Sequence, residues 1–168
     1  MLKDSQGKQM SYWKLSISDE WYTPQYVFDD LGVQFDMDVC SPGIPKACTP
    51  AKHHVVLPEN GLETNWNGFI WMNPPYGSKN QAWYKKFLAH GNGLALLTIA
   101  QLSTIKFTEL IPKIDGLLIY HKRLNLIDGT TGKRKNSPGG SLLVAMGTKA
   151  LQAIDQSTLG TVWVRSNK

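Results

Sequence analysis

The stretch Gly68-Phe69-Ile70-Trp71-Met72-Asn73-Pro74-Pro75-Tyr76 joins a short apolar run to a rigid polar ending. The run up to Met72 carries no charge and is too short for a helix, so it is typical of a buried strand. The two prolines cannot continue a strand, and they mark the point at which the chain leaves the sheet. The sequence therefore predicts a strand end that presents Asn73 and Tyr76.

Similar apolar runs alternate with helical patterns along the rest of the chain. Strands are expected at residues 33–39, 54–57, 93–100, 116–120 and 161–164, and helices at 24–31, 78–90, 104–111 and 149–156. Two alternating segments, 123–127 and 141–146, predict an antiparallel hairpin at the edge of the sheet. Together these patterns predict an α/β fold, in which helices flank a mostly parallel sheet and the antiparallel hairpin lies near the C-terminal end.

Length and composition narrow the class of protein. The chain has 168 residues and a formal net charge of +5. We expect one compact domain over residues 19–168, after a weakly ordered lead-in at 1–18. No apolar stretch is long enough to span a membrane, and the first residues lack the apolar core of a signal peptide. With only two cysteines, the composition favours a cytoplasmic location and excludes membrane, disulfide-rich and fibrous classes, while the positive charge favours a polyanionic partner.

The residues Asn73, Pro74, Pro75 and Tyr76 suit a planar group that carries an exocyclic NH2. The side-chain oxygen of Asn73 and the carbonyl oxygen of Pro74 can accept its two hydrogens, and Tyr76 can stack on its ring. The lone pair of an aromatic amine is delocalised into the ring, and two acceptors on its hydrogens make the nitrogen more nucleophilic. The motif therefore predicts a catalytic role for these residues in the transfer of an electrophilic methyl group.

Asn-Pro-Pro-Tyr can also be a rigid turn that merely follows a strand. Its position favours a site, because ligands of open α/β sheets bind beyond the carboxyl ends of strands. Two neighbouring features support this interpretation. The strand at 33–39 carries Asp36 and Asp38, and Thr23-Pro24 is typical of a helix start with Thr23 as the N-cap.

Several landmarks follow one another in a fixed order. They are Asp19-Glu20-Trp21-Tyr22-Thr23-Pro24, Phe35-Asp36-Met37-Asp38-Val39-Cys40-Ser41, Gly61-Leu62, Trp66, Asn73-Pro74-Pro75-Tyr76, Lys122-Arg123-Leu124, Ser137-Pro138 and Ser141-Leu142-Leu143-Val144. In this order they resemble the phage-type DNA N6-adenine methyltransferases related to Dam. The resemblance implies the Rossmann-like fold of methyltransferases that depend on S-adenosylmethionine (SAM), with SAM as the methyl donor. It also implies methyl transfer to adenine N6 in double-stranded DNA, with GATC as the first site to consider.

The resemblance also implies the residues of the SAM site. Tyr22, Thr23 and Pro24 match a segment that lines the methionine end of the cofactor, and Asp38 matches the acid at the end of the first strand. The glycine-rich loop that is usual after this strand in larger methyltransferases is absent, and Cys40-Ser41-Pro42-Gly43 stands in its place.

The chemistry of these residues agrees with a cofactor site. Asp36 and Asp38 can attract the α-ammonium or a ribose hydroxyl of SAM, although solvated strand acids are the alternative. Free N–H groups after Thr23 can bind the methionine carboxylate, and Cys40 is expected as a small residue near the cofactor. The acid on the ribose stays open among Asp36, Glu59 and Glu63, and Trp66 and Trp71 can either stack on an adenine or belong to the core.

Adenine N6 is buried in a duplex, so the base has to be flipped out while cations hold the phosphates. The expected DNA contacts are Lys133, Arg134 and Lys135 in the loop of the predicted hairpin, Lys122 and Arg123 at its base, and Lys79 after the motif. The alternative is a hairpin tip that only adds solubility. A chain of this length has little room for a separate target-recognition domain, so site choice is expected to come from short loops or from a homodimer.

Two other functions stay open. The same motif can methylate an RNA base or a protein glutamine amide, because an amide NH2 offers the same two hydrogens. A DNA-binding module that has lost catalysis is the second alternative. No metal is expected, because the spacing of Cys40, Cys48, His53 and His54 fits no common zinc site.

Overall fold

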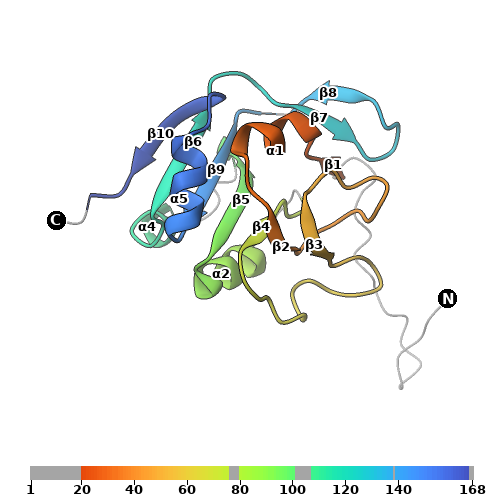
Figure 1. Ribbon diagram of the computed structural model, residues 1–168, viewed down its shortest axis with the longest axis horizontal. Helices are drawn as coiled ribbons and strands as arrows, with labels where there is room; N and C mark the ends of the chain where they lie inside the picture. The colour runs from red at the N-terminus through yellow and green to blue at the C-terminus, as the bar shows by residue number, and fades with distance from the viewer. Residues whose placement is uncertain (1–19, 76–79, 101–106, 138, 167–168) are drawn as a thin grey trace.

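Two sheets organise the residues that the computed structural model describes, which are 20–75, 80–100, 107–137 and 139–166 (Figure 1). The large sheet has the strand order β10-β6-β9-β5-β4-β2-β3, and the small sheet has the order β1-β7-β8. The strands are β1 (Trp21–Tyr22), β2 (Phe35–Asp38), β3 (Ala51–His54), β4 (Ile70–Met72), β5 (Gly93–Thr98), β6 (Gly116–Tyr120), β7 (Asn125–Asp128), β8 (Arg134–Asn136), β9 (Ser141–Met146) and β10 (Gly160–Val164). The helices are α1 (Gln25–Leu31), α2 (Gln81–His90), α4 (Phe107–Leu110) and α5 (Thr148–Asp155).

The large sheet is mixed. Strands β3, β2, β4 and β5 are parallel neighbours, whereas β9 is antiparallel to both β5 and β6, and β10 is antiparallel to β6. Because β5 and β6 both run opposite to β9, they share the direction of β2, β3 and β4. The α/β class is confirmed, but the expectation of a mostly parallel sheet is corrected, since half of the pairings between neighbours are antiparallel.

The predicted pairing of 123–127 with 141–146 is wrong. Strand β7 pairs with β8 and β1 in the small sheet, while β9 lies inside the large sheet between β5 and β6. All of β9 is buried, as its sequence Ser-Leu-Leu-Val-Ala-Met requires, and a strand covered on both faces cannot lie at an edge. In β9, apolar residues at every second position were compatible with an edge strand. The residues between them are also buried, which is typical of a strand in the centre of a sheet.

Several element boundaries also differ from the prediction. Strand β3 covers Ala51–His54, so it begins three residues before the expected strand at 54–57. The N-cap of α1 is Pro24 in an extended conformation, without a side-chain cap, so the prediction of Thr23 as the N-cap is wrong. The starts of the helices predicted at 78–90 and 104–111, together with the lead-in at 1–18, fall outside the described residues.

Helices cover both faces of the large sheet. Trp71 of β4 packs in a cluster with Phe28 of α1 and Ile154 of α5. Its neighbours in β4, Ile70 and Met72, point to the opposite face, where Phe87 of α2 joins their cluster. This division follows from the alternation of side chains along a strand, and it explains why β4 contains no polar residue. No helix among the described residues is long and apolar enough to cross a membrane.

The order of the strands creates a topological switch point between β2 and β4. From β2 the chain continues to β3 on one side, and then returns to β4 on the other side. In open α/β sheets, the loops beyond the carboxyl ends of two such strands diverge and leave a crevice for a ligand. The fold therefore places Asp38, at the end of β2, beside the residues that follow Met72 at the end of β4.

Lys86 of α2 fastens the connection between β3 and β4. Its ammonium group donates hydrogen bonds to the carbonyl oxygens of Gly61 (3.0 Å), Leu62 (2.9 Å) and Thr64 (2.5 Å). It also lies 4.8 Å from the centroid of the Trp66 ring, and burial lowers its pKa. Lys86 therefore anchors a long segment that forms no helix or strand.

We expect Lys86→Met to destabilise the protein, because it keeps the apolar stem and removes all three donors. The free energy of unfolding should fall by about 1–3 kcal/mol in urea denaturation. Lys85→Met is the matched control, since Lys85 is exposed on the same helix, and its effect should stay within about 0.5 kcal/mol. Equal stabilities of the two variants would contradict this role of Lys86.

The hairpin of β7 and β8 is held together near its turn by Asp128. The carboxylate accepts hydrogen bonds from the backbone N–H groups of Thr130 and Thr131, and it forms an ion pair of 2.6 Å with Lys135. Lys135, together with these N–H groups, lowers the pKa of Asp128 from 3.8 to about 2. The ionised carboxylate thus stabilises the hairpin above about pH 4, and this stabilisation is lost as the pH falls through the folded-state value.

The titration of Asp128 can be followed by NMR of its carboxyl carbon. We expect the resonance to stay constant from pH 6 down to about pH 3 in the wild type, and to begin moving near pH 4.5 in Lys135→Ala, because the variant returns the pKa toward its ordinary value. A wild-type resonance that moves over the same range as that of the variant would show that Lys135 does not set the pKa.

Candidate active site

A pocket opens at the switch point between β2 and β4. Its wall comes from four places in the chain: strand β1 and the residue after it, the end of β2, the loop that follows β2, and the end of β4. The lining residues are Trp21, Tyr22, Thr23, Asp38, Cys40, Pro42, Ala47, Cys48, Thr49, Trp71 and Asn73. The structure therefore brings together five residues that the sequence singled out, namely Tyr22, Thr23, Asp38, Cys40 and Asn73.

The amide of Asn73 is held in one orientation by two hydrogen bonds. Its Nδ2 donates to the backbone oxygen of Trp21 at 2.7 Å and to Oγ1 of Thr23 at 3.3 Å. Both hydrogens of the amide are used in this way, so Oδ1 is the group of this side chain that is left to accept. Asn73 thus offers a positioned acceptor at the pocket, as the proposed chemistry of the motif requires.

Asp38 supplies a buried negative charge to the pocket. Only 2% of the residue is exposed, and Oδ1 accepts a hydrogen bond from the backbone N–H of Cys40 at 3.3 Å. The other oxygen lies 3.7 Å from Nδ1 of His54, which is also 2.9 Å from the hydroxyl of Ser41. A buried carboxylate with few donors around it is able to bind a cationic ligand group.

Two other titratable groups that line the pocket, Cys40 and Tyr22, have raised pKa values. Burial, and then the negative charge of Asp38, raises the pKa of the Cys40 thiol well above its usual value. Burial also raises the pKa of Tyr22 to about 12, and its hydroxyl donates a 2.8 Å hydrogen bond to Glu20. Neither side chain is therefore a nucleophile, and both contribute shape and polarity to the pocket.

Four of the candidate residues lie elsewhere. Asp36 is at the opposite end of β2, where its carboxylate binds Lys52 and the N–H of Phe69. Pro24 is buried beside the pocket residue Thr23 without lining the pocket. The acids considered for the ribose, Glu59 and Glu63, bind their own loop through Thr64 and Asn60.

The tryptophans divide between the core and the pocket. Trp66 is buried, stacks on Trp83 and donates its indole N–H to the Gly61 carbonyl, so it belongs to the core. Trp71 is also in the core, but one part of it reaches the pocket wall.

Sequence reasoning identified only the start of the loop after β2, at Cys40-Ser41-Pro42-Gly43, and missed the rest of it as part of the site. Pro42, Ala47, Cys48 and Thr49 of this loop line the pocket. These residues have no periodicity and no charge, so no pattern marks them. The only available signal was their position after a strand that ends in an acid.

The basic residues do not form one continuous patch. Arg134 and Lys135 lie on β8 rather than in a loop, and consecutive residues of a strand point to opposite faces. Lys135 is also paired with Asp128. Lys133 is exposed at the turn of the hairpin, and Lys122 and Arg123 are exposed before β7.

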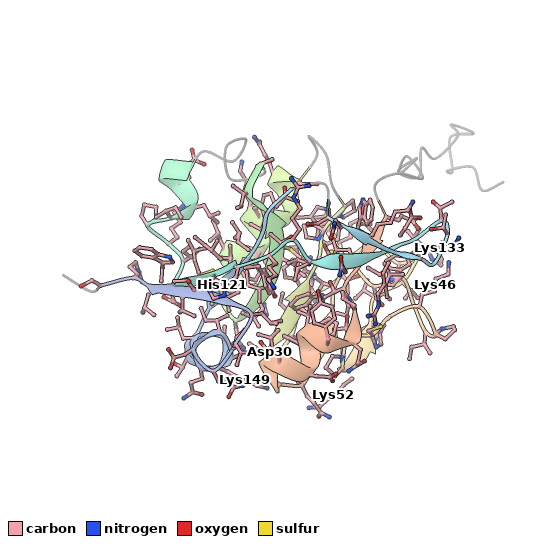
Figure 2. All side chains as sticks on the ribbon, turned by 90° about the horizontal axis from the view of Figure 1, so that it is seen from above. Asp30, Lys46, Lys52, His121, Lys133 and Lys149 are labelled. Atoms are coloured by element: carbon pink, nitrogen blue, oxygen red, sulfur yellow. The ribbon has the colours of Figure 1, made fainter. Side chains whose placement is uncertain are left out.

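Figure 2 shows Lys46, which the sequence analysis did not identify, at the same side of the molecule as Lys133. Lys46 is exposed on the same loop that lines the pocket. The turn of the hairpin and the loop after β2 thus bring two cations to one side of the molecule.

Two predicted site residues, Tyr76 and Lys79, fall outside the described part of the chain. Pro74 is buried and Pro75 is half-buried directly after Asn73. Within the residues described, no group of three or more His, Cys, Asp and Glu side chains is arranged to hold a metal ion.

Among the comparisons with known proteins, one identifies the family of the chain. A comparison with curated proteins found no match, and neither did a comparison with solved structures. The family model described as DNA N-6-adenine-methyltransferase (Dam) matches residues 10–163, which is nearly the whole chain. The positioned amide at the end of β4 and this match lead to one conclusion: the chain belongs to the Dam family of DNA adenine N6-methyltransferases.

Proposed function

We propose that this protein transfers a methyl group from SAM to N6 of an adenine that is flipped out of double-stranded DNA. The observation that carries the proposal is the fixed amide of Asn73 at the mouth of a pocket that also contains a buried carboxylate. A family of DNA adenine methyltransferases supplies the reaction class, and the residues of this chain supply the roles below.

The adenine side of the reaction rests on the acceptors at the end of β4. Because Nδ2 of Asn73 is occupied by Trp21 and Thr23, Oδ1 accepts one of the two hydrogens of the adenine amine. The carbonyl of Pro74 is the proposed second acceptor, and Pro75 and Tyr76 complete the motif, with Tyr76 stacked on the base. Acceptors on both hydrogens stabilise the positive charge that N6 gains as it is methylated, and one N6 proton is then released.

The pocket suits SAM by the chemistry of its residues. Asp38 provides a carboxylate for the α-ammonium group, and Trp21, Ala47 and Cys48 provide apolar surface beside it. Tyr22 and Cys40, which are neutral, add no charge that would compete with Asp38. When bound, SAM supplies the methyl group in an electrophilic form.

The proposal includes a Rossmann-like methyltransferase core. Supporting it, β2, β3, β4, β5 and β6 share one direction, helices cover both faces, and the pocket lies at the switch point. We further propose that residues 19–168 form a single domain. GATC is the first DNA site to test.

DNA is held, in this proposal, by exposed cations of the hairpin and of the loop after β2. Lys133 and Arg134 belong to the hairpin and Lys46 to the loop after β2, and all three are exposed. Further candidates for phosphate contacts are Lys122, Arg123 and Lys79. Lys135 forms an ion pair with Asp128 instead. Cations of this kind replace condensed counterions on the phosphates, which makes binding dependent on salt.

The reaction is tested by incubating the protein with methyl-labelled SAM and, separately, duplex DNA with GATC sites, RNA or a protein extract. We expect label in N6-methyladenine of the DNA. Asn73→Ala should reduce the rate more than about a hundredfold, since it removes the positioned acceptor. Asn65→Ala, which changes an exposed asparagine, is the control and should keep the wild-type rate.

Label in RNA or in glutamine, with none in DNA, would replace the proposed substrate. Near-normal turnover by a folded Asn73→Ala protein would rule out the proposed mechanism.

The DNA surface is tested by measuring affinity for duplex DNA at several salt concentrations. The variant Lys46→Ala/Lys133→Ala should bind more weakly and reduce the slope of log K against log salt by about 0.9 for each lost phosphate contact. SAM affinity should not change. Lys113→Ala is the control, because Lys113 follows α4, at the opposite side of the molecule from β8 (Figure 1).

An unchanged slope in the double variant would place the DNA elsewhere. A loss of SAM affinity equal to the loss of DNA affinity would show that the two lysines support the pocket instead of contacting phosphates.

A further inference from the structure

Strand β1 lies between the hairpin and the Asn73 amide, and it is bonded to both. On one side, Trp21 and Tyr22 pair with Asp128 and Ile127 of β7. On the other side, the Trp21 carbonyl accepts the 2.7 Å hydrogen bond from Asn73. A two-residue strand is thus the physical link between the proposed DNA-binding hairpin and the proposed catalytic side chain.

The alternation of backbone groups explains how so short a strand can serve both neighbours. Successive carbonyls of an extended chain point to opposite sides. The Glu20 carbonyl faces the hairpin and accepts a 2.8 Å hydrogen bond from the N–H of Gly129, whereas the next carbonyl, that of Trp21, faces Asn73. A shift of β1 relative to the hairpin would therefore move the acceptor that orients the Asn73 amide.

The contact between β1 and the hairpin leaves no free space at Gly129. A Cβ atom at this position would lie 2.7 Å from Cβ of Glu20 and 2.9 Å from the hydroxyl of Tyr22. A side chain at this position would require Glu20, directly before β1, and the side chain of Tyr22 in β1 to shift. The hairpin turn and β1 are therefore packed as one unit.

Thr23 completes the link on the side of the site. Only 5% of Thr23 is exposed. Its side chain does not cap α1, and its Oγ1 accepts the second hydrogen bond from Asn73. The hydroxyl and the Trp21 carbonyl together accept both amide hydrogens, so both contribute to the direction of Oδ1.

We propose that β1 transmits the position of the DNA-bound hairpin to the Asn73 amide, with Thr23 and the Trp21 carbonyl as positioning groups for catalysis. DNA that is seated on the hairpin holds β1 in register, and the register of β1 orients Oδ1 toward the amine of the target base. The inference rests on the proposed function, since it assigns a means of regulation to that same site.

The test compares Gly129→Ala with Gly139→Ala. Both add one methyl group to the chain between β7 and β9, but at Gly139 the added Cβ meets nothing within 4 Å. We expect Gly129→Ala to slow single-turnover methylation about three- to tenfold at saturating DNA and SAM, while the Kd for DNA stays within about twofold, because the damage is to orientation rather than to phosphate contacts. Gly139→Ala should match the wild type in both measurements.

Thr23 is tested by Thr23→Val, which keeps the shape and removes the hydroxyl, against Thr23→Ser, which keeps the hydroxyl. The valine variant should lose about three- to tenfold in single-turnover rate without loss of SAM affinity, and the serine variant should recover most of it. Equal rates in the two variants, or a rate loss that follows SAM affinity, would overturn the positioning role of Thr23.

An NMR measurement separates this inference from the proposed function. The side-chain NH2 signals of Asn73, identified by their absence in Asn73→Ala, should shift in Gly129→Ala and in Thr23→Val but not in Gly139→Ala. Signals that are unmoved in Gly129→Ala would refute the link even if the protein methylates DNA. If the Asn73 signals shift in these two variants but the wild-type protein methylates no DNA, the link is supported and the proposed function is rejected.

Discussion

The two hydrogen bonds of the Asn73 amide are the constraint on which the site depends. They join the end of β4 to the Trp21 carbonyl and the Thr23 hydroxyl, and so they close the pocket between segments 52 residues apart in the chain. Each bond contributes only about 1 kcal/mol net, but leaving a half-buried carbonyl without a donor costs more. The same bonds decide which end of the amide is left for a ligand, so one interaction serves stability and chemistry together.

The charges of the molecule are separated in a way that suits two different ligands. Among the described residues that line the pocket, Asp38 is the carboxylate, and burial raises the pKa values of Tyr22 and Cys40. The cations Lys46 and Lys133 lie outside on exposed loops (Figure 2). The buried acid in the pocket suits a small methyl donor that carries an ammonium group. The exposed cations suit a polyanion that binds at the surface. The small sheet connects these two regions, because its hairpin is cationic and its β1 borders the pocket.

Much of the large sheet was predictable because its strands are unbroken apolar runs. The segments that became β4, β5 and β6 were expected nearly where they lie, and the motif was expected at a strand end. The pairing of β7 was not predictable, since its partner β8 is the exposed sequence Arg134-Lys135-Asn136, which carries no strand pattern at all. Asp36 and Asp38 show the same limit at the level of the site. They look equivalent in the sequence, yet only Asp38 stands at the carboxyl end of β2, where the pocket opens.

The sequence by itself determined the chemistry that this protein can offer: an amide acceptor that follows a buried strand and precedes two prolines, an acid at the end of another strand, and a resemblance to a family that contains both. Only the tertiary structure decided how that chemistry is aimed. The shorter hydrogen bond of the Asn73 amide is donated to the backbone carbonyl of Trp21, a group that every residue possesses and that no residue type in the sequence marks. The order of the strands, and the place of the short β1 beside the hairpin, decide which carbonyl lies within hydrogen-bond distance of Asn73. Local side-chain patterns carry no information about that choice, because it is made by contacts between segments that are distant in the chain.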